Sequence, residues 1–238
     1  MTSSNGEPSD EERRRSASHV LLDIGHEPAL DSVVISLPTE VEHHLGRVLR
    51  LRDGASVSVT DGAGRWRMAA WRSATGDLES TSDVAVDERL APLTLATSIP
   101  KGDRVDLLVQ KSTELGVGRV LLLHAEHSVV RWKSDRAAKQ IVRLTRIADE
   151  AVRQSRRVWR VPVEGPFTAV DVIGGGVLAE PGGASLTGDE QMVAIGPEGG
   201  WSDSELALAE RTVSLGSGIL RVETAAIAVC ALRMAVGH

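Results

Sequence analysis

A glycine-rich segment in the C-terminal third has the composition of a ligand-binding loop. It reads Ile195–Gly196–Pro197–Glu198–Gly199–Gly200–Trp201 and follows an apolar run at 192–196. Ser202 and Glu205 come next, in the spacing of a capping box at a helix start. Glycines let a backbone approach a ligand closely, and open α/β sheets bind ligands at the carboxyl ends of their strands. A tight strand-to-helix turn would also use glycines, so both interpretations stay open. The loop lacks the glycine patterns of dinucleotide and phosphate sites.

A second segment, 215–225, also places glycines after an apolar run and then begins a helix. Glu223 and Thr224 suit a helix N-terminus, because they complement its free amides and its dipole. Arg221 does not, since a cation is disfavoured there. A partner such as Glu198, Glu223 or an anionic ligand would explain Arg221.

Basic side chains mark a third segment. Between 131 and 160 the chain has ten Arg or Lys and three acids, a charge of +7 in a chain whose net charge is −6. On the helix expected from Ser134, the basic residues form one stripe about 100° wide. They are Arg136, Lys139, Arg143, Arg146, Arg153 and Arg157. A solvated helix face usually mixes signs, whereas only Glu150 interrupts this stripe, so we expect it to contact the phosphates of a nucleic acid.

The elements that must position these segments divide the chain in two. The part before Val86 is rich in short strands and has a strong turn signal at Asp61–Gly64. After Pro92, strands alternate with helices, which favours an α/β fold around a mainly parallel sheet. Helices are expected at 40–51, 103–115, 134–157, 202–211 and 223–236. Strands are expected at 19–23, 33–37, 55–60, 66–71, 93–99, 120–124, 176–179, 192–196 and 213–215.

Composition limits the remaining classes of function. Cys230 is the only cysteine, so an intrachain disulfide is excluded. The sequence contains no run of about 20 apolar residues, which is the length that a membrane-spanning helix needs. Residues 1–17 are polar and are interpreted as a disordered tail rather than a secretory signal. The histidines show no ligand spacing supported by cysteines or acids, so no metal site is expected.

Several motifs together resemble one known family, the bacterial 16S ribosomal RNA uracil-N3 methyltransferases. The resemblance rests on Lys101–Arg104, Gln110–Val117, Glu126–Arg131, Glu150–Ala151 with Gln154–Ser155, Ile195–Trp201 and Leu215–Ala225, in matching order over 93–236. The stretches His43–Arg52 and Asp61–Gly64 are similar to that family's RNA-binding module. Two positions depart from the family pattern, namely Ser217–Gly218 and Arg156.

The resemblance implies a fold and a cofactor. The fold is α/β, a SPOUT-type trefoil-knot methyltransferase domain at 89–238 preceded by a small PUA-like β-barrel at 18–88. The enzyme would be a cytoplasmic homodimer that acts on the 16S rRNA of the small ribosomal subunit. RNA would also contact Arg47, Arg50 and Arg52. S-adenosylmethionine would be held by Leu178, Ala179, Glu180, Ile195, Gly196, Glu198, Gly199, Gly200, Leu215, Gly216, Ile219, Leu220 and Thr224.

The chemistry of the implied reaction assigns the remaining roles. Uracil N3 is a weakly acidic imide, and it must lose its proton before or while it attacks the methyl group. An arginine cannot be the base, but it can stabilise negative charge on the uracil oxygens. Arg221 is the first candidate and Arg131 the second. Glu223 or Glu198 would take the proton or orient Arg221, and the sequence leaves that choice open. Two alternatives remain: a SPOUT enzyme that methylates another RNA atom, and a non-catalytic RNA-binding protein.

Overall fold

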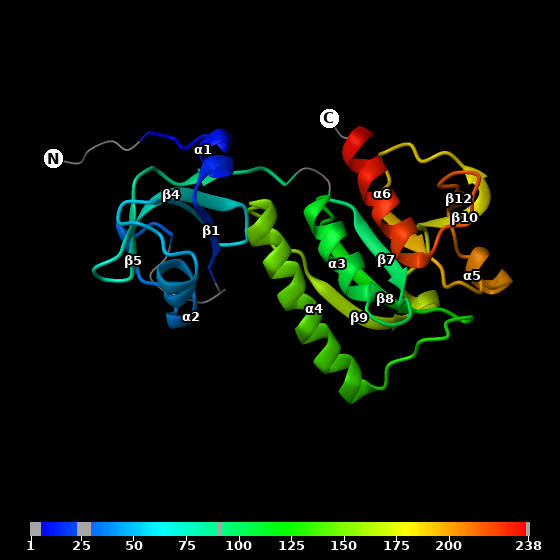
Figure 1. The fold of residues 1–238 in the computed structure, drawn as a ribbon. Coiled ribbons are helices and arrows are strands. Elements are labelled where there is room, and N and C mark those ends of the chain that lie inside the picture. Colours follow the sequence, from blue (N-terminus) through cyan, green and yellow to red (C-terminus); the bar gives the residue numbers. More distant parts are fainter. Residues whose placement is uncertain (1–5, 23–29, 90–91, 237–238) are drawn as a thin grey trace. The chain divides into compact units, whose positions relative to one another are not determined.

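The computed structural model describes residues 6–22, 30–89 and 92–236, which form two compact units. The first unit runs up to Arg89 and also includes Val152–Arg160. The second contains the described residues up to Ala151 and those from Val161 onward. Figure 1 shows the elements of both units.

The first unit is built on a mixed sheet of six short strands. They are β1 (Ser18–Leu21), β2 (Val34–Ile35), β3 (Ser56–Thr60), β4 (Arg65–Arg72), β5 (Asp77–Ser80) and β6 (Ala85–Val86). Their order is β1-β3-β4-β5-β2, with β6 paired to β4. Apolar residues along the strands and on the connection between β2 and β3 form a core that includes Ile35, Leu45, Val57, Trp71 and Leu78. The expected helix at 40–51 is shorter: α2 (Thr39–His43) continues into one π-helical segment, η1 (His44–Val48).

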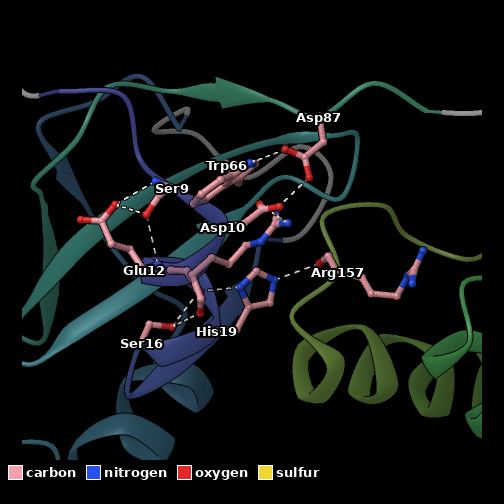
Figure 2. Close-up of polar contacts among 10 residues, drawn as sticks. Ser9, Asp10, Glu12, Ser16, His19, Trp66, Asp87 and Arg157 are labelled. Atoms are coloured by element: carbon pink, nitrogen blue, oxygen red, sulfur yellow. Dashed lines mark hydrogen bonds and ion pairs between the residues drawn. The ribbon is translucent and has the colours of Figure 1, made fainter. Parts of the chain in front are cut away.

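The N-terminal segment differs from the disordered tail expected at 1–17. Residues Asp10–Arg15 form a helix, α1, whose N-cap Ser9 makes a capping box with Glu12. Arg13 pairs with Asp87 at 2.8 Å and lies over the ring of Trp66, and Trp66 donates to Asp87 through Nε1. Figure 2 shows Trp66 and Asp87 joined in this way. Partners far along the chain therefore stabilise a segment whose own composition is that of a tail.

The segment Val152–Arg160 completes the first unit. Val158 packs with Trp66 and Met68, and its carbonyl accepts hydrogen bonds from Thr60 Oγ1 and Gly64 N–H. The turn signal at Asp61–Gly64 has its physical reason here. A Cβ at Gly64 would come within 2.3 Å of the Trp159 ring, and φ there is +94°. Glycine is therefore needed at this close approach.

The second unit is a parallel sheet in the order β12-β10-β11-β7-β8-β9. Its strands are β7 (Thr94–Ser98), β8 (Arg119–His124), β9 (Val163–Thr168), β10 (Val177–Ala184), β11 (Met192–Ile195) and β12 (Arg211–Val213). Every neighbouring pair is parallel, as the alternation of strands and helices predicts. The sequence does not predict β9, because this segment contains Gly165–Pro166 and gives little strand signal.

Helices follow most of these strands. They are α3 (Arg104–Glu114), α4 (Ser134–Ser155), α5 (Asp203–Leu206) and α6 (Val222–Val236), with a short 3₁₀ turn, η2 (Ala169–Asp171). α5 is much shorter than the helix expected at 202–211, because Arg211 already begins β12. α6 packs on α3 and on β7 and β11 (Figure 1), so the chain returns from the edge strand β12 to the centre of the sheet. Among the described residues, no helix is long and apolar enough to cross a membrane.

Candidate functional site

Strands β11 and β12 end at the same level of the sheet, beside Ala179 of β10. Ala179 of β10 is in register with Ile195, the last residue of β11, and with Val213, the last residue of β12. Because these strands are neighbours and parallel, the segments that follow β11 and β12 leave from the carboxyl end of the sheet. The expected cofactor residues 195–200 and 215–220 belong to those two segments, and residues 178–180 lie within β10 beside them. The sheet therefore brings together three stretches that are distant in the sequence.

The buried side chain of Trp201 anchors the loop between β11 and α5. The indole is buried and donates from Nε1 to the carbonyl of Ala179, 3.2 Å away. Gly196 lies against the same ring, since a Cβ there would come within 2.9 Å of it. Gly200 has a φ of +76° and open space where a Cβ would be. The loop is thus anchored on one side and presents bare backbone on the other, which suits a ligand held through main-chain groups.

The last residues of β10 contact the chain at the end of β12. A Cβ at Gly183 would come within 2.6 Å of the backbone nitrogen of Val213, and Ser214 N–H donates to the carbonyl of Ala184 at 2.7 Å. From Gly216 onward, the loop that leads to α6 is exposed to solvent. Gly216 has a φ of +130°, no described atom lies within 4 Å of the place that a Cβ would take, and Ile219 is 92% exposed. An exposed isoleucine on this loop is available to cover the apolar part of a ligand.

Arg221 and Glu223 stand at the start of α6, but they do not pair with each other. Arg221 is exposed and has no hydrogen bond or ion pair from its side chain within the described part of the chain. Glu223 is buried, and its Oε1 lies 3.6 Å from Nε of Arg104 at the start of α3. Its Oε2 is buried and has no hydrogen-bond partner among the described residues. Glu198 is exposed. Neither of the two carboxylates that the sequence suggests for Arg221 pairs with it within the described part of the chain.

Arg131 closes the loop that follows β8. Its Nη2 donates to the carbonyls of Ala125 and Glu126, at 2.7 and 3.1 Å. The backbone N–H of Trp132 donates to Nε2 of His124, and burial, together with the charge of Arg131, lowers the pKa of that histidine. Nε and Nη1 of Arg131 have no hydrogen-bond partner among the described residues, so the guanidinium keeps donors for a substrate.

The basic stripe of α4 is only partly free. Arg136, Lys139, Arg146 and Arg153 are exposed, while Ile141, Leu144, Ala148 and Val152 turn the apolar face inward. Arg143 is exposed but paired with Asp106 of α3. Arg157 lies past the end of α4, in the first unit, where burial lowers the pKa of its guanidinium.

In the first unit, the three other arginines expected to bind RNA are all exposed. Arg47 is on η1, and Arg50 and Arg52 follow it, Arg50 with a φ of +50°. For metals, no cluster of three or more His, Cys, Asp or Glu side chains occurs within the described ranges.

Two residues belong to this edge of the sheet although the sequence does not single them out as site residues. Arg104 is the ion-pair partner of Glu223, and it ends the motif Lys101–Arg104. The sequence predicts Glu205 only as a helix cap, yet its Oε1 also accepts a hydrogen bond from Glu126 N–H, 79 residues away. No local pattern indicates such a hydrogen bond. Only the order of strands in the sheet brings these loops together.

Comparisons with known proteins agree with this geometry. A family model described as an RNA methyltransferase domain matches residues 87–175 and 177–234, and an RNA methyltransferase PUA domain matches 37–70. The ribosomal RNA small subunit methyltransferase E of Synechocystis is 35% identical in an alignment that covers 80% of this chain and 69% of the relative. The enzyme of that name from Mycobacterium tuberculosis is 30% identical and covers 77% of this chain, which in turn covers 79% of the relative.

A solved structure is similar over most of the chain. It is a ribosomal RNA small subunit methyltransferase E from Neisseria gonorrhoeae bound to S-adenosyl methionine, 28% identical, with a TM-score of 0.76 over 91% of this chain and 97% of that one. The chain therefore belongs to the RNA methyltransferase family of the SPOUT class, with a PUA domain, that includes the ribosomal RNA small subunit methyltransferases E.

Proposed function

We propose that this protein transfers a methyl group from S-adenosylmethionine to N3 of a uridine in 16S ribosomal RNA. The names of its relatives support a substrate in the small ribosomal subunit, and the Neisseria structure supports the cofactor. The motifs shared with the uracil-N3 methyltransferases support N3 of uridine as the atom that is methylated. We place the reaction in the cytoplasm, where ribosomal RNA is found in bacteria.

The cofactor would bind where the loops after β11 and β12 leave the sheet, beside residues 178–180 of β10. The bare backbone at Gly200 and Gly216 leaves room for a ligand to approach, and Ile219 and Leu220 are exposed beside it. Ala179 and Glu180 would form the first wall, with Leu215 and Thr224 beside the loop after β12. Leu178, which the sequence also suggests, is fully buried in the apolar core of the second unit and would support this wall from behind. The sulfonium of S-adenosylmethionine supplies an activated methyl group, so the protein's task is to place and polarise the acceptor.

Arg221 would act on the uracil. Its guanidinium is a permanent cation without a partner among the described residues, and a planar fork can meet a carbonyl oxygen as the imide loses its proton. Arg131 holds a second set of free donors at the same edge of the sheet. Glu198 is exposed and can meet a substrate proton, whereas Glu223 holds Arg104 and has its other oxygen buried. We therefore assign proton transfer to Glu198 and the ordering of the start of α6 to Glu223.

RNA would contact both units. Arg136, Lys139, Arg146 and Arg153 form the exposed part of the stripe on α4, and Arg47, Arg50 and Arg52 give the PUA domain a basic surface of its own. Lysines and arginines that neutralise phosphates supply most of the affinity that does not depend on sequence. An acidic chain with local basic surfaces can bind RNA in this way.

The active protein would be a homodimer. Leu107 of α3 and Leu232 and Met234 of α6 remain about two-fifths exposed, although the two helices pack together. Apolar side chains of this size on paired helices provide a surface that a second copy could cover.

The register of β10, β11 and β12 is the observation that supports this proposal most, because the motif residues after β11 and β12 begin beside residues 178–180 of β10. The test is methylation of small ribosomal subunits, and separately of free 16S rRNA, by purified protein with labelled cofactor. Digestion to nucleosides and mass spectrometry should give 3-methyluridine. A ribose-methylated or guanine-methylated product would favour another SPOUT activity. Absence of both methylation and cofactor binding would favour a non-catalytic RNA-binding protein.

A further inference from the structure

The side chain of Glu205 joins two loops. It is 2% exposed. Its Oε2 accepts hydrogen bonds from the backbone N–H and the hydroxyl of Ser202, at 3.0 and 3.2 Å. The first of these, with the hydrogen bond from Glu205 N–H to Ser202 Oγ at 3.3 Å, forms the capping box expected from the sequence. Its Oε1 accepts one from the backbone N–H of Glu126, at 2.9 Å. Ser202 follows the proposed cofactor loop, and Glu126 lies on the loop after β8.

Further interactions hold the same two loops together. Nδ1 of His127 lies 3.2 Å from the carbonyl oxygen of Gly200. A Cβ at Gly199 would come within 3.0 Å of His127 Cβ, so the two loops lie in close contact at this glycine. Ser204 Oγ also donates to the Glu126 carboxylate at 3.4 Å. A displacement of the loop at 196–200 therefore acts directly on 126–127.

The loop after β8 transmits such a displacement to Arg131. The Arg131 guanidinium donates to the carbonyls of Ala125 and Glu126, and Ser128 Oγ accepts from the N–H of Ala125. The loop is thereby closed on itself. A shift of the Glu126 backbone moves two of the atoms that orient Arg131.

We propose that Glu205 is a positioning residue that couples cofactor binding at 196–200 to the placement of Arg131. This inference rests on the proposed function for the identity of the cofactor. A cap on a helix of four residues uses only one carboxylate oxygen and does not account for a fully buried glutamate. The second oxygen is accounted for by Glu126, because a buried carboxylate is tolerated where each oxygen finds a donor.

Two variants separate the cap from the link between loops. Glu205→Asp keeps a carboxylate at the third position of α5 but, being one methylene shorter, cannot reach both Ser202 and Glu126. Ser202→Ala removes the capping hydroxyl and leaves the hydrogen bond with Glu126 in place. Amide hydrogen exchange with and without S-adenosylmethionine then reports on 196–202 and on 126–131 separately. It needs neither RNA nor turnover.

In the wild-type protein, we expect saturating cofactor to slow exchange on the order of tenfold at 196–202 and at 126–131. In Glu205→Asp, the slowing at 196–202 should persist, while that at 126–131 should fall below about twofold. Ser202→Ala should behave as wild type. Equal slowing at 126–131 in Glu205→Asp and wild type would overturn the coupling, and so would an equal loss in Ser202→Ala. If the cofactor slows exchange nowhere in wild-type protein, the proposed cofactor site itself fails and the coupling fails with it.

Discussion

Replacing Arg221 with lysine tests the proposed chemistry with little disturbance of the fold. Arg221 is exposed, it precedes the first residue of α6, and its side chain has no partner within the described part of the chain. The variant keeps the positive charge and loses the planar fork of donors. A cation at a helix N-terminus is unfavourable for either residue, so the exchange leaves that contribution nearly unchanged.

The expected losses differ greatly between stability and rate. A surface substitution of a side chain without partners changes the free energy of unfolding by about 0.5 kcal/mol or less. Loss of one preorganised donor to a developing negative charge lowers the rate on the order of 10²–10³-fold, or about 3–4 kcal/mol. Affinities for cofactor and RNA should change little, because the interaction forms fully only in the transition state.

Single-turnover methylation with enzyme in excess isolates the chemical step. Calorimetry with S-adenosylmethionine and a filter-binding assay with RNA measure the two affinities in parallel. Arg146→Lys is the matched control, because that exposed residue on α4 would contact phosphates, for which a lysine is nearly as good. A near-wild-type single-turnover rate for Arg221→Lys would refute the assignment and move the catalytic role to Arg131.

Three further predictions concern the cofactor, the RNA and the first unit. Gly199→Val should abolish cofactor binding in calorimetry while the protein stays folded, because a Cβ there would lie 3.0 Å from His127 and the branched side chain would displace the loop. Gly174→Ala is the control, since a Cβ at Gly174 would lie in open space. Unchanged affinity in Gly199→Val would remove this loop from the site. Arg136→Glu with Arg146→Glu should weaken RNA binding, leave cofactor affinity intact and flatten the log–log salt dependence by about one unit for each phosphate that is no longer neutralised; an unaltered slope would mean that the stripe is only solvated. Burial lowers the pKa of His19 to about 4, so the folded state favours the neutral ring, and stability should fall as pH decreases from about 6.5 towards 4, by up to roughly 3 kcal/mol. Urea unfolding should show this loss in wild-type protein but not in His19→Gln, and identical pH dependence of the two would exclude His19 as its source.

The hydrogen-bond partners of His19 give that last prediction its physical basis. Nδ1 lies 2.7 Å from Ser58 Oγ, and Nε2 lies 2.9 Å from the carbonyl oxygen of Arg157. Figure 2 shows the ring between the N-terminal segment and the chain that follows α4. Because a carbonyl only accepts, Nε2 carries the proton and Nδ1 can accept from Ser58, so the neutral ring satisfies both partners. A second proton would place another cation near Arg13, Arg153 and Arg156.

Local sequence patterns are sufficient to predict most helices and strands of the second unit. The apolar runs predict the buried strands β7, β8, β10 and β11, and the one-sided apolar face predicts α4 almost to its ends. The capping box of Ser202 and Glu205 is confirmed. These features depend on periodicity and neighbouring residues, which a single sequence contains.

Features that depend on distant residues could not be predicted. α1 is six residues long and is held by Asp87 and Trp66, more than fifty positions away. Likewise, Trp159 packs on the turn at Gly64 and so joins Val152–Arg160 to the first unit. Nothing near either segment in the sequence indicates these interactions.

The candidate site shows the same division. The motifs identify Arg221, Glu223 and the glycine loops, but they do not say which groups meet. Glu223 is one of the partners that the sequence suggests for Arg221, and the structure pairs it with Arg104 instead. Likewise, Arg143 and Arg157 belong to the stripe that the sequence predicts. In the structure, Arg143 is paired with Asp106, and Arg157 is partly buried. A helical projection gives the direction of a side chain but not what the neighbouring element places against it.

The central claim concerns the atom that is methylated, and one measurement addresses it directly. Small-subunit ribosomal RNA from cells that lack this protein, and from the same cells after the wild-type protein is restored, can be digested to nucleosides and analysed by mass spectrometry. We predict that 3-methyluridine is absent without the protein and returns with it. Persistence of 3-methyluridine at the wild-type level in cells that lack the protein would contradict the proposed function.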